Sequence, residues 1–326
     1  MDRRAFLTAA AATVLGVGTR DGLLAQSSSS QPIRLIVPFA PGGAPDPYAR
    51  LIADHMARSL ARTIIVEHKP GASGNTGMQF VMQEPVDGNL MVLATQSLME
   101  LNPSTFSNLK WRLEDLIPLI RGVEAPLVLV ANPGVPARTV SELVAWIKNS
   151  PGKLSYSSYT AGSPSHFLGF QLNERFGLDL VHVPSKGSGF QATELMAGHV
   201  QFGFAQLQST LPLISEGKLN ALALTSNARS HFLPNVPSFA ELGYPEFTAN
   251  VWFGLMVRAG TASDVVARLL GAAKAAHADP DMKARLEAQG FAVSGQSGPE
   301  FASDIAAQKE RWARLVKASG FKGPGN

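Results

Sequence analysis

Short apolar runs alternate with amphipathic segments along most of the chain, and the runs end at proline, glycine or polar clusters. This pattern predicts strands over 33–37, 63–67, 90–94, 118–131, 154–157, 180–183, 200–204, 221–225 and 251–257. Apolar spacing typical of helices predicts helices over 47–60, 75–83, 139–148, 163–176, 190–197, 207–215, 262–276, 281–289 and 299–318. Strands that alternate with helices in this way favour parallel sheets, here in two successive α/β series followed by a helical C-terminal tail.

Several predicted helices have recognisable starts. Thr139 is followed three residues later by a glutamate, which is the spacing of a capping box. Ser163 precedes Pro164 and Asp46 precedes Pro47, so each of these pairs is expected to supply an N-cap and the first helical residue.

The first 25 residues have the layout of an export signal. Arg3 and Arg4 precede an apolar stretch over 5–18, which is too short to span a bilayer as a helix. The arginine pair resembles the twin-arginine motif, and a general-secretory signal is the alternative. Residues 26–31 include four serines and are expected to form a flexible mature N-terminus. The sequence therefore predicts cleavage after Ala25 and a periplasmic protein.

Composition narrows the class of function. The 326 residues, 45% of them hydrophobic, are expected to fold as one large or two smaller domains. A net charge of +3 without any block of basic residues gives no sign of nucleic-acid binding. The absence of cysteine excludes a disulfide, a thiolate metal site and a cysteine nucleophile, and the seven histidines show no metal-binding spacing. No metal and no cofactor is therefore expected.

Glycine-rich turns between predicted strands and helices remain as candidates for chemistry. They cover 39–46, 70–77, 159–166 and 185–189. In open α/β sheets, ligands bind outside the carboxyl ends of the strands, where such turns gather. Backbone N–H groups at helix starts attract anions, and glycine allows close approach. These turns predict an anion site, with ordinary tight connections between elements as the alternative.

The order and spacing of several short motifs resemble the substrate-binding receptors of tripartite tricarboxylate transporters, known as the Bug family. The similarity extends over about residues 32–316. Its motifs are RLIVPF at 34–39, KPGASGNTG at 69–77, GSPSH at 162–166, VPSKG at 183–187 and WFGL at 252–255. Each motif is short, and their order and spacing together make the resemblance specific.

The resemblance implies an α/β protein with the two-domain periplasmic binding protein fold, type II-like, with two crossover strands and a ligand cleft between the domains. One domain would comprise 32–126 plus 249–326, and the other 127–248. It implies a monomeric receptor without enzymatic activity, which captures a small organic carboxylate by domain closure. The receptor would deliver this ligand, an aliphatic di- or tricarboxylate or an aromatic acid, to the membrane permease subunits of a tripartite transporter.

The resemblance also implies which residues bind the ligand. In the first domain they are Phe39, Gly42, Gly43, Ala44, Asp46, Ser73, Gly74, Asn75, Gln96 and Ser97. In the second domain they are Thr160, Gly162, Ser163, His166, Lys186, Gly187 and Gln206. Taken by themselves, His166 could equally be a core histidine and Lys186 a solvated turn residue.

Two departures from the family pattern bear on the ligand. Ala205 stands where many members have an aspartate, which argues against an amino-acid ligand. Ser185 replaces a common tyrosine and is expected to widen the mouth. Phe39, Tyr159 and Phe190 are then expected to pack on a ring or apolar tail.

Two other functions stay open from the sequence. One is a receptor that presents its solute to a sensor protein. The other is an exported enzyme that uses Asp46 and His166 for acid–base chemistry.

Overall fold

The structure is a computed structural model that describes residues 31–150 and 154–323. Its strands are β1 (Ile33–Val37), β2 (Ile64–His68), β3 (Leu90–Thr95), β4 (Leu116–Ala131), β5 (Ser155–Ser158), β6 (Val181–Pro184), β7 (Phe202–Gln206), β8 (Asn220–Leu224), β9 (Asn250–Arg258) and β10 (Ala292–Ser297). The predicted export signal over 1–25, and all but residue 31 of the predicted segment 26–31, lie outside the described residues.

The helices follow the strands along the chain, and α10 comes after the last strand. They are α1 (Pro45–Leu60), α2 (Asn75–Gln83), α3 (Asn102–Thr105), α4 (Val140–Asn149), α5 (Pro164–Phe176), α6 (Ser188–Met196), α7 (Leu207–Ser215), α8 (Ser263–Ala278), α9 (Pro280–Ala288) and α10 (Gly298–Ser319). Shorter helical turns are η1 (Ala72–Gly74), η2 (Ser97–Leu101), η3 (Leu113–Asp115) and η4 (Pro245–Phe247), of which η2 is π-helical.

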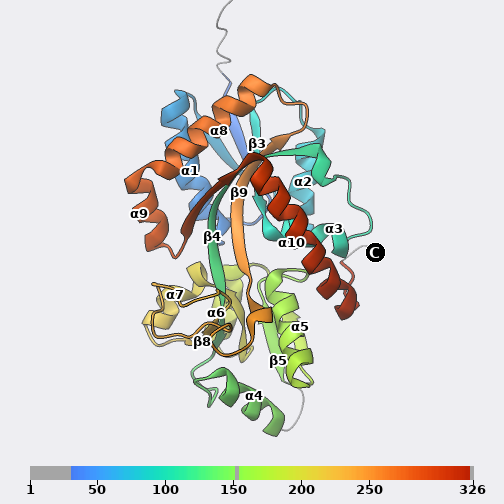
Figure 1. Ribbon diagram of the computed structural model, residues 1–326, viewed down its shortest axis with the longest axis vertical. Coiled ribbons are helices and arrows are strands. Elements are labelled where there is room, and N and C mark those ends of the chain that lie inside the picture. The colour runs from blue at the N-terminus through green and yellow to red at the C-terminus, as the bar shows by residue number, and fades with distance from the viewer. Residues whose placement is uncertain (1–30, 151–153, 324–326) are drawn as a thin grey trace, which may run out of the picture. The chain divides into compact units, whose positions relative to one another are not determined.

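The strands form two groups that share the long strand β4. In the first group β1 pairs in parallel with β2 and β3, and β3 pairs antiparallel with β9. In the second group β5 pairs in parallel with β6 and β7. We call the part built on β1, β2, β3 and β10 the first lobe, and the part built on β5 to β8 the second lobe. Figure 1 shows β4 and β9 running side by side from one lobe into the other.

The partner of β4 changes in the middle of that strand. Pro126 is opposite Asn250 of β9, whereas the next residue, Leu127, is opposite Gln206 of β7. The predicted domain boundary at 126/127 falls at this change of partner. The boundaries themselves stay a prediction.

Alternation along the strands builds a core on each face of each sheet. In the first lobe, Leu35 of β1 packs with α1, α8 and α9, whereas the neighbouring Ile36 packs with α2 and α10 on the opposite face. In the second lobe, Leu129 of β4 packs with α4 and α5, whereas Val130 packs with α6 and α7. Each lobe is therefore a sheet between two helical layers.

Helix α10 connects the two lobes through their cores. Its N-terminal half places Phe301 and Ile305 in the first-lobe core, and its C-terminal half places Trp312 and Val316 in the second-lobe core. Figure 1 shows it running from the first lobe toward α5. It is a third connection beside β4 and β9.

Most predicted elements are confirmed, and the exceptions have identifiable causes. Strand β10 was missed because the segment AVSGQS lacks alternating apolar residues, and its pairing comes from contact with β4. The segment over η2 and α3 was also not predicted. Strand β7 begins two residues later than predicted, because pairing starts where Phe202 lies opposite Ala131.

The helix caps were predicted with one error. Thr139 forms the expected capping box with Glu142, and Ser163 caps α5. Helix α1, however, begins at Pro45, so Asp46 is its second residue rather than its N-cap. Pro45 suits the first helical position because its ring sets φ near the helical value.

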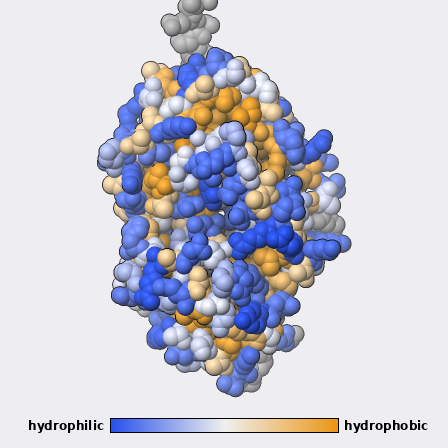
Figure 2. All heavy atoms as spheres, in the orientation of Figure 1, coloured by the Kyte–Doolittle hydropathy of each residue, from blue (hydrophilic) through white to orange (hydrophobic). Residues whose placement is uncertain are grey.

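Figure 2 shows mostly hydrophilic side chains on one face, with apolar patches between them. Among the helices of the described residues, none is both long and apolar enough to cross a membrane.

Candidate functional site

A cavity of about 550 Å³ lies between the lobes. Its walls are the turns that follow β1, β2 and β3 in the first lobe and the turns that follow β5, β6 and β7 in the second. Residues 251–253 of β9 complete the lining. The cavity thus lies at the carboxyl ends of strands from both lobes, where open α/β sheets bind ligands.

The turn after β1 is stabilised by a hydrogen bond to Asp46, which lies on the side away from the cavity. The N–H of Gly42, whose φ is +78°, donates to the Asp46 carboxylate at 3.1 Å. The same carboxylate lies 3.1 Å from Nε2 of His68 and 3.0 Å from Nε of Arg50. Asp46 is therefore held by contacts within its own lobe and is not part of the cavity lining.

The turn after β2 has an unusual backbone. Ala72 and Ser73 have φ of +46° and +53°, in the left-handed region that non-glycine residues seldom adopt. Asn75 follows this turn and anchors it to the lobe. Its Oδ1 accepts from Asn102 Nδ2 at 3.1 Å and from Trp111 Nε1 at 3.2 Å. The strained turn presents Ser73 and Gly74 to the cavity.

The turn after β5 rests on the start of α5. Ser163 Oγ donates to the Thr160 carbonyl at 2.6 Å, and the N–H of Gly162 donates to Nδ1 of His166 at 3.2 Å. The imidazole of His166 stacks on that of His182 with ring centroids 3.7 Å apart. Burial lowers the pKa of His166 to about 4, so it is neutral at neutral pH. These residues support Thr160 and do not line the cavity.

The turn after β6 leads into α6. Gly187, with φ of +132°, is the N-cap position, and Ser188 begins the helix with a buried hydroxyl. Ser185 donates to Glu194 of the same helix. The start of α6 therefore faces the cavity with its free backbone N–H groups.

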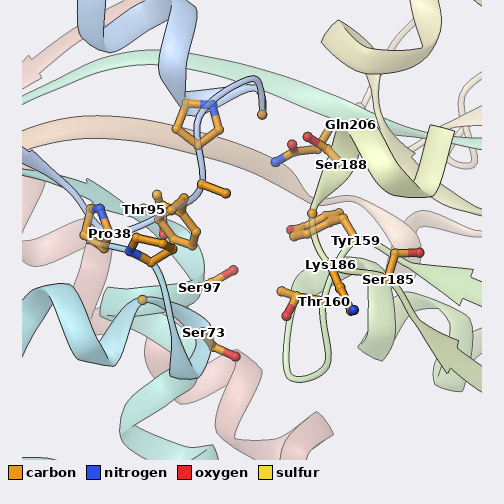
Figure 3. A pocket seen from close by; sticks show the side chains of 18 of the residues that line it. Pro38, Ser73, Thr95, Ser97, Tyr159, Thr160, Ser185, Lys186, Ser188 and Gln206 are labelled. Carbon is orange, nitrogen blue, oxygen red and sulfur yellow. The ribbon is translucent and has the colours of Figure 1, made fainter. Parts of the chain in front are cut away.

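Two hydrogen bonds join the lobes across the mouth of the cavity. The N–H of Ala44 donates to Ser188 Oγ at 3.2 Å. Ser73 Oγ donates to the Ala161 carbonyl at 3.3 Å. Figure 3 shows the two walls facing each other, with Ser73 and Ser97 on one side and Tyr159, Thr160, Ser188 and Gln206 on the other.

The lining has few charges. Among the lining residues described, Lys186 is the single charged side chain, it is exposed, and no carboxylate is present. Polar groups include the hydroxyls and amides of Ser97, Thr160, Gln96 and Gln206, together with turn backbone. Apolar surface comes from the rings of Phe39, Tyr159, Phe190, Trp252 and Phe253 and from four prolines. Such a site can hold an anionic group and an apolar body.

Eleven predicted site residues line the cavity and six lie behind its walls. The eleven are Phe39, Gly42, Gly43, Ser73, Gly74, Gln96, Ser97, Thr160, Lys186, Gly187 and Gln206. The six are Ala44, Asp46, Asn75, Gly162, Ser163 and His166. The two residues of the acid–base alternative, Asp46 and His166, are both in the second set. Which residues touch a ligand stays a prediction.

Several lining residues were not predicted. They include Pro38, Pro70, Thr95, Ser188, Val251, Trp252 and Phe253. Pro70 and Ser188 lie within the predicted glycine-rich turns 70–77 and 185–189, which was a usable signal. Trp252 belongs to the family motif at 252–255 but was not predicted in the site, since it lies in a strand far along the chain and enters the site through pairing with β3 and β4.

Among residues 31–150 and 154–323, no group of three or more histidine or acidic side chains lies close enough together to hold a metal ion.

The chain is similar in sequence and in fold to known proteins. The profile of the tripartite tricarboxylate transporter family receptors, TctC, matches residues 48–321. Protein BugT of Bordetella pertussis is 32% identical over 305 residues, which is 91% of this chain and 92% of BugT. The periplasmic binding protein BugD is 30% identical, with a TM-score of 0.83 over 89% of this chain and 98% of BugD.

A further solved structure contains a ligand. Rpa4515 of R. palustris with adipate is 26% identical, with a TM-score of 0.85 over 89% of this chain and 98% of Rpa4515.

Proposed function

Since the chain belongs to the tripartite tricarboxylate transporter receptor family, TctC, we propose that it captures a small organic carboxylate and delivers it to the membrane subunits of such a transporter. The family consists of periplasmic solute-binding receptors. The predicted export signal fits a protein that works in the periplasm and loses residues 1–25 on the way.

The chemistry of the cavity carries this proposal. Helices α6 and α7 begin at its walls, so the free N–H groups of their first turns favour an anion. No carboxylate side chain in the lining opposes a negative ligand, and Lys186 lies at the edge. The same lack of a carboxylate leaves no partner for an ammonium group, which argues against amino acids.

The apolar lining favours a carboxylate with an apolar body. Phe39 and Tyr159 come from the turns after β1 and β5, Phe190 comes from the start of α6, and Trp252 and Phe253 come from β9. Rings arranged in this way pack well against an aromatic ring or a methylene chain. Rpa4515, which has this fold, is described with adipate, whose two carboxylates are joined by such a chain.

Capture proceeds by closure of the lobes in this proposal. The Ala44–Ser188 and Ser73–Ala161 hydrogen bonds stabilise the closed form, and β4 and β9 are the segments that bend. A ligand that touches both walls shifts the equilibrium toward closure by its differential affinity for that state. The domains that move are 32–126 plus 249–326 and 127–248.

A thermal-shift screen of residues 26–326 tests the proposal. The panel holds aliphatic di- and tricarboxylates, aromatic acids, acidic amino acids and neutral sugars. A ligand at about 100 times its Kd stabilises the folded protein by about 2.7 kcal/mol. A shift with carboxylates alone supports the proposal, and a shift with amino acids or sugars alone contradicts it. If nothing shifts, mass spectrometry after denaturation shows whether a carboxylate has co-purified, and its absence also counts against the proposal.

A further inference from the structure

Glu100 is a fully buried carboxyl group close to the cavity. It lies in η2, the π-helical turn that follows β3, and its exposed fraction is 0%. One oxygen, Oε1, accepts from the indole Nε1 of Trp252 at 2.7 Å. The other, Oε2, has no hydrogen-bond partner among the described residues. Trp252 itself lines the cavity.

Gln96 lies between this carboxyl and the cavity. Its side-chain amide donates to the Glu100 carboxyl, which lowers the pKa of that group. Gln96 is 4% exposed and belongs to the cavity lining. Its Oε1 is also buried without a hydrogen-bond partner. Two neighbouring side chains thus each carry an unsatisfied acceptor, which is costly in a protein interior.

One proton on Glu100 gives a hydrogen-bond partner both to Oε2 of Glu100 and to Oε1 of Gln96. A protonated carboxyl has an O–H donor, and the carbonyl oxygen of a glutamine side chain is an acceptor. With the proton on Oε2 and the Gln96 amide turned so that its Oε1 faces Glu100, Glu100 donates to Oε1 of Gln96 and still accepts from Trp252. The amide nitrogen of Gln96 is then left with its two N–H donors for the cavity.

The charged groups around Glu100 would compensate a negative charge on its carboxyl only poorly. Arg121 of β4 and Asp304 and Arg311 of α10 face it, and Arg121 is already paired with Asp304 at 2.6 Å. The neighbouring elements β3, η1 and α3 contain no titratable residue. Burial raises the pKa of Glu100 to about 8, so the carboxyl is mainly neutral at neutral pH.

We propose that Glu100 is a positioning residue, whose protonated carboxyl holds the Gln96 amide with its N–H groups toward the cavity, where they donate to a carboxylate ligand. When Glu100 loses the proton, the Gln96 amide turns to donate to the carboxylate of Glu100. Its carbonyl oxygen then faces the cavity and repels an anion. This inference rests on the proposed function and adds that ligand affinity depends on a proton held outside the cavity.

Calorimetric titration with adipate tests the inference. Wild type is compared with Glu100→Gln at pH about 6 and about 9, because the amide of the variant donates to Gln96 at every pH. With a pKa of about 8, roughly a tenth of Glu100 is protonated at the higher pH. Wild type is expected to bind adipate about tenfold more weakly there, because affinity scales with the competent fraction. The variant is expected to show no such loss.

Glu310→Gln, at an exposed position of α10, is the matched control and should keep the wild-type pH profile. A wild-type profile in Glu100→Gln would overturn the inference, since the pH effect would then come from a group other than Glu100. A flat wild-type profile would overturn it as well.

A measurement without ligand separates this inference from the proposed function. The side-chain amide NMR signals of Gln96, assigned through Gln96→Leu, should shift between pH about 6 and about 9 in wild type and stay fixed in Glu100→Gln. If wild type binds no adipate, the substrate proposal fails for this probe and the amide signals still decide the inference. Signals that do not move in wild type would overturn it.

Discussion

At the scale of single residues, Gly43 is a position where an added side chain is expected to block the cavity while the fold persists. A Cβ there would meet Pro45, the Ala40 carbonyl and Ser188 at 3.6 to 3.8 Å, which is ordinary contact. We expect Gly43→Ala to fold and to bind almost normally. We expect the branched side chain of Gly43→Val to enter the cavity and lower affinity by about tenfold or more, or at least about 1.4 kcal/mol. Calorimetry with a carboxylate from the screen, with circular dichroism as the folding control, checks both. Unchanged binding by Gly43→Val would remove this turn from the site.

Glu100 also makes a prediction about stability. Its pKa is about 8 in the folded protein against an ordinary value of 4.5, so the folded state holds the proton more tightly. Its contribution to the free energy of unfolding is present below pH 4.5 and is lost as pH rises to about 8, by at most about 1.4 kcal/mol per pH unit. Glu100→Gln lacks this loss. Urea unfolding at several pH values measures this. Between pH 4.5 and about 8, the free energy of unfolding of wild type should fall relative to that of Glu100→Gln. If the two proteins show the same pH dependence, Glu100 is not buried in its neutral form.

At the scale of elements, the contact between α5 and β6 is sensitive to acid. His166 of α5 and His182 of β6 stack, and burial lowers their pKa values to about 4 and about 3. A histidine with a lowered pKa stabilises the fold above its ordinary value of 6.5. That stability is lost as pH falls from 6.5 toward the folded values, because the unfolded chain binds the proton first.

His182→Phe keeps a ring in this stack and removes one of the two titrating groups. It also loses the hydrogen bond to Ser158, so a lower stability at neutral pH is expected. The decline between pH about 6.5 and about 4 should become shallower by up to about 1.4 kcal/mol per pH unit. Thermal melts across this range measure the slope. A slope equal to that of wild type would show that His182 stays exposed to protonation in the folded state.

At the scale of the whole molecule, the proposed closure of the lobes gives a prediction for the hydrogen bond between Ala44 and Ser188, which joins them at the cavity. Ser188→Ala removes the acceptor for the N–H of Ala44 and leaves the α6 start intact. A net hydrogen bond is worth about 1 kcal/mol, so affinity is expected to fall about fivefold. Small-angle scattering should show a larger radius for the ligand-free variant.

Ser215→Ala, at the exposed end of α7, is the control for this substitution, since its hydroxyl bonds only within its own helix. An equal fall in affinity for both variants would mean that Ser188 has no special part in closure.

Most strands and helices could be predicted because each is signalled by the pattern of a few adjacent residues. The strand over 33–37, the capping box at Thr139 and the cap at Ser163 each depend on a few adjacent residues. Strand β10 escaped prediction because its segment is half polar and becomes a strand only by pairing with β4. Asp46 was misplaced as a cap because Pro45 and Pro47 both suit the first helical position, and in the structure the helix begins at Pro45.

The sequence by itself determined the two α/β series, the glycine-rich turns and, through their order, the family. It also placed Ser97, Thr160 and Gln206 at the ends of strands, where a ligand site forms. Only the tertiary structure decided which turn residues face the cavity and which, like Asp46 and His166, brace it from behind. It alone brought Trp252 beside Glu100, residues 152 positions apart. The physical reason is that strand and helix signals act over a few residues, whereas burial and hydrogen bonding depend on segments that meet only when the sheets and α10 have packed.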